Sequence, residues 1–120
     1  MVNTIGLDEK KSKQLAEMLN DLLANYQVFY QNLRGFHWNV KGNKFFELHL
    51  KFEEYYDDAV IKIDEIAERI LTLQGVPLHT FESYIKHFEI QSVQQDKVDA
   101  SILPTVLNNF SVLIKKERTI

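Results

Sequence analysis

The chain has 120 residues, of which 26% are charged and 45% hydrophobic, which is enough for one domain with a hydrophobic core. It contains no cysteine, which excludes disulfides, thiolate metal sites and cysteine nucleophiles together. A net charge of −3 and a pI near 5.8 give no global attraction to phosphate backbones, so nucleic-acid binding would need a local basic patch.

The sequence shows no targeting or membrane segment. No apolar run approaches the roughly 20 residues that span a bilayer, so we expect a soluble protein with no membrane partner. The stretch 1–7 is short and is followed by charged residues, unlike a secretory signal. A cytoplasmic location is therefore expected.

The first predicted element is a long helix from about Asp8 to about Asn39. Asp8 and Glu9 suit the positive N-terminal end of a helix. Apolar residues recur at intervals of four and three, the pattern of a helix packed in a bundle. These positions are Leu15, Leu19, Leu22, Tyr26, Phe29 and Leu33.

A turn at 41–43 predicts the start of a second long helix, with Asn43 as its N-cap. We expect that helix to end where Gly75 supplies a C-terminal cap, with Pro77 two residues on. Its apolar positions are Phe45, Phe46, Phe52, Tyr56, Val60, Ile63, Ala67 and Leu71.

A short helix is predicted next, capped by Thr80 and with Phe81, Tyr84 and Ile85 on one side. It lies in the connection between two long helices. The polar stretch 91–97 predicts a loop.

The final predicted helix carries Val106, Phe110, Leu113 and Ile114. We expect Ser101 to be its N-cap, because Pro104 then falls in the first turn, where a missing N–H costs nothing. A start at Val98 would instead put a kink at Pro104.

No segment has the period of a strand, so the predicted fold class is all-α. Three long helices and one short helix favour an antiparallel bundle in a single domain, 1–120. A regular bundle has four long helices, so the chain ends one helix early.

Four polar residues of the second helix lie on one face. His49, Glu53, Asp64 and Glu68 have offsets of 0, 4, 15 and 19 residues. At 100° per residue they project at about 0°, 40°, 60° and 100°. Along the axis, however, the first pair lies about 22 Å from the second, so one ion cannot contact both pairs.

The two pairs can meet across a two-fold axis between antiparallel copies of this helix, which would pass near residues 58 and 59. His37, near the end of the first helix, can complete each of the two sites. Two imidazoles and three carboxylates suit iron, manganese or zinc, unlike the thiolate sets of structural zinc.

A plainer interpretation stays open at this point, because carboxylates on a helix usually form a solvated face. Glu54, Asp57, Asp58 and Glu65 fit that description. His79 and His87 fall in the connection after the second helix, and we assign them no role. The Glu-x-x-His motif of bundle-core di-iron proteins is absent from the four histidine positions.

Three stretches, "FHWNVKG", "FFELHLKFEEYYDD" and "IDEIAERILTLQGVPL", resemble the Dps family of mini-ferritins, the DNA-binding proteins from starved cells. The resemblance covers nearly the whole chain. It implies a ferritin-like bundle and a hollow dodecamer with ferroxidase centres between two-fold-related subunits. The family's ligands fall on His37, His49 and Glu53 of one subunit, and on Asp64 and Glu68 of its partner. Many relatives carry aspartate at the position of Glu53, whose longer arm still supplies a carboxylate.

The resemblance also implies an activity: ferrous iron is oxidised with hydrogen peroxide, and ferric oxide is stored in the cavity. Such chemistry suppresses hydroxyl radicals and protects against oxidative damage. Trp38 resembles an aromatic residue found near the family's site and is a candidate electron or radical relay. Its alternative role is packing at a subunit interface.

Two rival functions remain: an architectural protein that condenses DNA, and a plain helical oligomerisation module. DNA condensation in relatives uses mobile basic tails, which supply the phosphate contacts. Here Lys10, Lys11 and Lys13 are offset by Asp8 and Glu9, so we expect weak or no DNA binding.

This chain differs from the family at its C-terminus. Family members have one more long helix after a position near Arg118, which is missing from this chain. We therefore expect an incomplete sequence, with Val106, Phe110 and Leu113 lacking part of their partner surface. Pore residues and the assembly of this form stay unassigned.

Overall fold

The computed structural model describes residue 2 and residues 6–42, 45–93 and 98–120; the side chains of 98–103 also lie outside the description. It contains four helices within these residues: α1 (Glu9–Asn39), α2 (Phe45–Thr72), α3 (Phe81–His87) and α4 (Val98–Thr119). No strand occurs in the described part, where a single isolated bridge joins Val2 and Asp8. The all-α prediction is confirmed.

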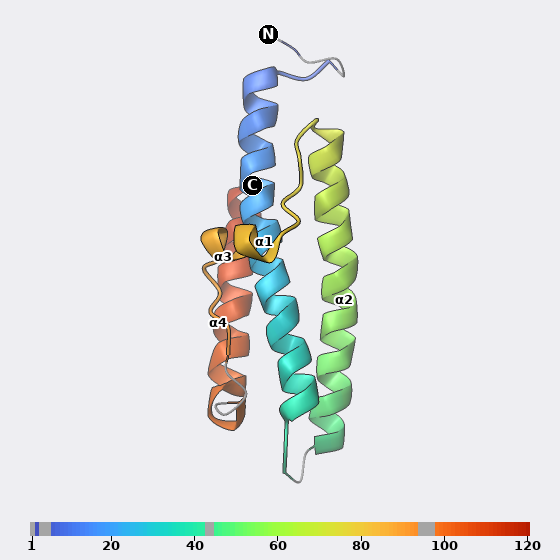
Figure 1. Ribbon diagram of the computed structural model, residues 1–120, viewed down its shortest axis with the longest axis vertical. Helices are drawn as coiled ribbons and strands as arrows, with labels where there is room; N and C mark the ends of the chain where they lie inside the picture. Colours follow the sequence, from blue (N-terminus) through green and yellow to red (C-terminus); the bar gives the residue numbers. More distant parts are fainter. Residues whose placement is uncertain (1, 3–5, 43–44, 94–97) are drawn as a thin grey trace.

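Helix α1 lies between α2 and α4 (Figure 1). It runs antiparallel to both, so α2 and α4 run parallel to each other, which the prediction of an antiparallel bundle did not include. The connection after α2 returns along α1 over its described residues 73–93, so α4 runs in the same direction as α2. The described residues contain no helix that is both long enough and apolar enough to cross a membrane.

The start of α1 is fixed as predicted. The Asp8 carboxylate accepts a hydrogen bond from the Lys11 amide at 2.8 Å, which pairs one of the free N–H groups of the first turn. The apolar stripe is also confirmed, since Leu15 is half-buried and the rest are buried: Leu19, Leu22, Tyr26, Phe29 and Leu33.

Two core clusters hold α1 against its neighbours. Near the start of α1, Leu19 and Leu23 pack with Ile70 of α2 and with Leu73, which directly follows that helix. Further along, the larger cluster joins Phe36 with residues of α2 and α4, including Phe52 and Leu113. These contacts set the depth and rotation of α2, and therefore which of its residues remain outside.

The C-terminal cap of α2 differs from the prediction. Gln74, with φ of 65°, adopts the left-handed conformation, and the Gly75 amide donates to the Ile70 carbonyl at 2.9 Å. Gly75 is needed for a different reason: a Cβ there would lie 3.0 Å from the Ala16 Cβ. The glycine allows the close approach of α1, while Gln74 reverses the chain.

Three asparagines of α1 anchor the connection that follows α2, and the sequence analysis did not identify them. The Asn20 side chain bonds the backbone of Val76 and Leu78, and Asn32 bonds that of Gln91 and Val93. Between them lies the fully buried side chain of Asn25. It accepts from the Glu89 and Ile90 amides at 2.7 and 3.0 Å and donates to backbone carbonyls on its other side.

Helix α3 begins as predicted, because the Thr80 side chain accepts from the Ser83 amide at 3.1 Å. Its apolar residues face outward, and Phe81 and Ile85 are among the exposed ones. Residues 91–93 are non-helical, as the loop prediction requires. Residues 94–97, and Asn43 as the predicted cap of α2, lie outside the described residues.

The predicted start of α4 is wrong. The helix begins at Val98 rather than after Ser101, and Pro104 is inside it. A proline at such an interior position removes its own amide from the hydrogen-bond ladder, and its ring crowds the carbonyl four residues earlier. The expected exposure of α4 is also partly wrong: Val106 and Leu113 are buried against α1, whereas Phe110 is exposed.

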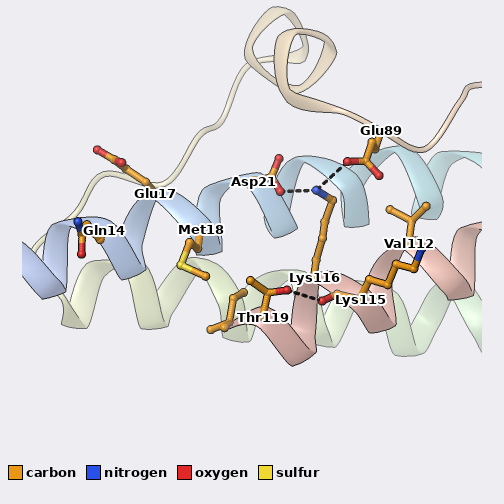
Figure 2. A pocket seen from close by; sticks show the side chains of 10 residues that line it. Gln14, Glu17, Met18, Asp21, Glu89, Val112, Lys115, Lys116 and Thr119 are labelled. Atoms are coloured by element: carbon orange, nitrogen blue, oxygen red, sulfur yellow. Dashed lines mark hydrogen bonds and ion pairs between the residues drawn. The ribbon is translucent and has the colours of Figure 1, made fainter.

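A salt-bridge network lines the groove between α1 and the end of α4 (Figure 2). The Lys116 ammonium lies 2.5 Å from Asp21 and 3.4 Å from Glu89. Burial alone would lower the pKa of Lys116, but its bonds to these two carboxylates outweigh that effect and raise it. The groove of about 690 Å³ contains none of the candidate metal ligands.

Candidate metal centre

His37 and His49 form a reciprocal pair where α1 and α2 meet. Their rings stack with centroids 3.6 Å apart and planes 19° from parallel. The His37 Nδ1 lies 2.6 Å from the His49 carbonyl oxygen, and the His49 Nδ1 lies 2.7 Å from the His37 carbonyl oxygen. Each ring is thus held by the backbone of the other helix.

These hydrogen bonds fix the tautomer of both rings. A carbonyl oxygen only accepts, so each Nδ1 must carry the proton and donate. Each Nε2 of a neutral ring is then left with a free lone pair. This is the form in which imidazole binds metals, with its other nitrogen oriented by a backbone acceptor.

The local structure explains why the pair forms. His37 is in the last turn of α1, where the carbonyls have no partner within the helix, and the His49 N–H supplies one. Helix α2 begins at Phe45 and runs back alongside α1, so residues twelve apart in sequence come into register. The stack requires both the end of α1 and the start of α2.

Two further aromatic rings enclose the histidines. Phe45 stacks on His49 at 5.0 Å, and Tyr56 meets the His37 ring edge-to-face at 5.3 Å. Burial, followed by the negative charges of Glu53 and Asp57, raises the pKa of the Tyr56 phenol. The sequence analysis assigned these two rings no role at the site, although Tyr56 follows His49 by seven residues, two turns along the same side.

The carboxylates are less well supported by the chain. Glu53, one turn after His49, is half-buried, whereas Asp64 and Glu68 are exposed. Among the residues that the structure describes, no three His, Cys, Asp or Glu side chains of one chain gather as metal ligands would. The chain therefore brings together His37 and His49 but leaves the distant acids apart, as their spacing along α2 requires.

The same side of α2 carries exposed apolar residues. At 100° per residue they project between about 20° and 120° from His49, among the predicted ligands. We call this surface, ligands and apolar residues together, the outer stripe of α2. Its exposed apolar members are Phe46, Leu50, Val60, Ile61 and Leu71.

The other acids of α2 behave as a solvated face. Glu54 pairs with Lys51 at 3.1 Å, and Asp58 pairs with Lys62. Both acids are exposed, so these pairs contribute little to stability. His79 and His87 are exposed too, and the ring Nδ1 of each lies near a backbone carbonyl.

Trp38, the candidate relay, packs against Arg34 of the same helix. Its side chain is 56% exposed, and the Arg34 guanidinium lies 4.7 Å above its ring. Arg34 also lies 5.3 Å from the centre of the Tyr30 ring. The candidate relay is therefore covered by a cation.

Helices of this order and the paired histidines define the class of protein. A family model described as ferritin-like domain matches residues 16–120, so the chain is a ferritin-like protein. Within that class it belongs to the Dps family. The "DNA protection during starvation protein" of Porphyromonas gingivalis is 42% identical over 120 residues, covering 100% of this chain and 76% of that relative.

Solved structures agree with this assignment. The Dps protein of Vibrio cholerae O1 is 48% identical with a TM-score of 0.88, covering 98% of this chain and 74% of that one. It is described as a member of a broad superfamily of ferritin-like diiron-carboxylate proteins. A Dps protein of Bacillus brevis is 36% identical with a TM-score of 0.85, covering 90% of this chain and 72% of the other.

Proposed function

We propose that this protein is a ferroxidase and iron-storage mini-ferritin whose sites are shared between two-fold-related subunits. The observation that carries the proposal is the reciprocal pair of His37 and His49, which leaves both Nε2 atoms free as ligands. Glu53 would bind from the same subunit, and Asp64 and Glu68 from the partner. This mixed nitrogen and oxygen set suits ferrous iron, and also zinc or manganese.

The outer stripe of α2 supports the two-fold arrangement. An axis near residues 58 and 59 places residue i of one copy opposite residue 117 − i of the other. That register sets His49 opposite Glu68 and Glu53 opposite Asp64. It also sets the exposed Phe46 opposite the exposed Leu71, so one packing covers apolar surface and completes two sites.

The chemistry is an oxidation of two ferrous ions by hydrogen peroxide. Two Fe²⁺ each lose one electron, the O–O bond breaks, and two protons complete two water molecules. Hard carboxylate oxygens bind the ferric product more strongly, which favours the oxidation. The two histidines are held by backbone carbonyls and need no rearrangement to bind the substrate ion.

We also propose that the protein forms a homo-oligomeric, dodecameric shell in the cytoplasm. This shell would store ferric oxide and limit oxidative damage. DNA binding is proposed to be weak or absent. Lys10, Lys11 and Lys13 belong to the first turns of α1 beside Glu9, rather than to a separate tail. A tight, salt-sensitive complex in a gel-shift titration would contradict this part.

Anaerobic titration with Fe²⁺, followed by peroxide, tests the activity. We expect ferric absorbance to rise in proportion to peroxide, with one peroxide consumed for two ferrous ions. Absorbance no greater than in a protein-free control would remove the ferroxidase proposal and leave a plain oligomerisation module.

A further inference from the structure

The charged residues of α2 are separated onto two sides of the helix. Its lysines and arginine project at about 200° to 220° from His49, away from the outer stripe of α2. They are Lys51, Lys62 and Arg69. Four acids project instead at about 40° to 100°, on the side of the outer stripe. They are Glu53, Asp57, Asp64 and Glu68. The stripe therefore carries carboxylates but no lysine or arginine of α2.

These four carboxylates have no counter-charge within the part of the chain that the structure describes. The two lysines of α2 form ion pairs with Glu54 and Asp58 instead. Arg34 of α1 lies one turn before His37, but it contacts the Tyr30 and Trp38 rings and forms no ion pair with a described residue. The negative charge of the stripe is therefore not neutralised by its own chain.

The proposed two-fold register brings these carboxylates together. Glu53 faces the partner's Asp64, and Asp57 lies beside the two-fold axis. Like charges brought together at an interface oppose association, whereas the exposed apolar Val60 and Ile61 near the axis favour it. Packing of two stripes therefore depends on what neutralises the carboxylates of both copies.

We propose that divalent metal ions control subunit association through this surface. This inference rests on the proposed function. Ions bound at the two shared sites supply the positive charge that allows the outer stripes of two copies to pack together. In the metal-free protein the stripes repel each other, and the chain stays in smaller particles.

The size of the effect follows from the linkage between binding and association. One chain offers an ion three ligands, His37, His49 and Glu53, whereas two paired chains offer five at each site. An ion that prefers the five-ligand site about 100-fold raises the association constant about 100-fold for each site that it fills. Because each pair of copies forms two sites, saturation with metal raises that constant about 10⁴-fold. By reciprocity, association strengthens metal binding at each site.

Sedimentation velocity of the full chain at one protein concentration tests this linkage. The probe is Zn²⁺, which binds nitrogen and oxygen ligands and has no redox chemistry. We expect small particles after treatment with EDTA, larger particles with Zn²⁺, and small particles again after a second addition of EDTA. Mg²⁺ at the same concentration screens charge but prefers oxygen ligands and water, so it should leave the particles small. Equal particle sizes with EDTA and with Zn²⁺ would overturn the proposal.

Asp57 separates charge repulsion from metal binding, because it lies on the side of the stripe but is not a predicted ligand. Asp57→Asn should raise the association constant of the metal-free protein several-fold and keep the response to Zn²⁺. Glu54→Gln, at an exposed acid outside the stripe, is the matched control and should behave as wild type. Equal metal-free association of the two variants would contradict the role of the stripe's charge.

Arg34→Gln tests the competing source of positive charge. We expect this variant to keep the small metal-free particles and the response to Zn²⁺. Metal-free association of wild type that is lost in Arg34→Gln would assign the neutralisation to arginine and overturn the proposal.

Ferric product measured on the same samples separates this inference from the proposed function. Ferric product from a protein whose particle size ignores Zn²⁺ would remove the linkage and leave the ferroxidase. Zinc-dependent association without ferric product would support the linkage and remove the ferroxidase.

Discussion

Two parts of the outer stripe of α2 differ in how the chain supports them. His49 is stacked on His37, bonded to the backbone of α1 and covered by Phe45. Asp64 and Glu68 are exposed, about 22 Å further along the same helix face. The histidine part of the predicted site is organised within one chain, whereas the carboxylate part would be completed only by a second chain.

The difference is consistent with the proposed shared site, whose two parts would have different structural requirements. The histidines need a fixed tautomer and orientation, and only a folded α1–α2 pair provides them. The carboxylates need to be presented to another molecule, for which exposure on a regular helix suffices. Exposed Phe46 and Leu71 beside the two parts supply the apolar area that would hold the copies together.

The largest expected effect comes from a charge within the apolar part of the stripe. Leu71→Glu would bury an unpaired carboxylate opposite Phe46 of a second copy, which costs about 3–5 kcal/mol. We expect smaller particles in sedimentation velocity and loss of peroxide-driven iron oxidation. Val76→Glu, at an exposed position just after α2, is the control and should assemble normally. Unchanged assembly of Leu71→Glu would show that this surface is not the interface.

Removal of an organised ligand should have the next largest effect. His49→Ala is expected to weaken Fe²⁺ binding by at least about 100-fold, because even residues that only orient ligands contribute 10- to 100-fold. Anaerobic titration measures it, and His79→Ala is the matched control. Equal affinities of the two variants would exclude His49 as a ligand.

The two parts should also differ in what they contribute to the fold. Loss of the His49 ring leaves the His37 carbonyl without its donor, so His49→Ala should cost about 1–3 kcal/mol of unfolding free energy. Asp64→Ala should stay within about 0.5 kcal/mol of wild type, as for an exposed side chain. Urea unfolding in metal-free buffer, with Leu71→Glu present in both variants, measures the difference without assembly. Similar costs would mean that the histidines are no better organised than the acids.

The smallest expected effect is on the pH dependence of stability. It arises at the α1–α4 contact, away from the outer stripe of α2. Burial and a 2.5 Å hydrogen bond to Glu117 raise the pKa of Tyr26 above its ordinary value of 10.0. The unfolded chain then ionises first, so stability is complete below pH 10 and falls as pH rises above it. Tyr26→Phe should reduce that fall by up to about 1.4 kcal/mol per pH unit. Tyr55→Phe is the control, and an alkaline slope equal to that of Tyr26→Phe would contradict the assignment.

The helices could largely be predicted because they depend on local periodicity. Asp8 capped α1, Thr80 capped α3, and the spacing of Leu19, Leu22 and Phe29 set the buried side of α1. The 100° rotation per residue placed the four proposed ligands of α2 on one face, and their role as ligands stays a prediction.

The remaining features depend on contacts between distant segments. Asn25 looks like an ordinary polar residue of a helix, and only the returning connection reveals its buried bonds to Glu89 and Ile90. The left-handed Gln74 was missed because glycine is the usual residue there, yet Gly75 was needed against Ala16. The tautomer of the histidines required backbone geometry that no spacing contains.

The central claim is that each site takes ligands from two subunits, and subunit mixing tests it most directly. His49→Ala and Asp64→Ala proteins should each be inactive alone, because every site lacks one ligand. After equal mixing and confirmed exchange, half of the dimers are mixed and hold one complete site, so about a quarter of wild-type ferroxidase activity should return. No recovery despite complete exchange would contradict the shared site.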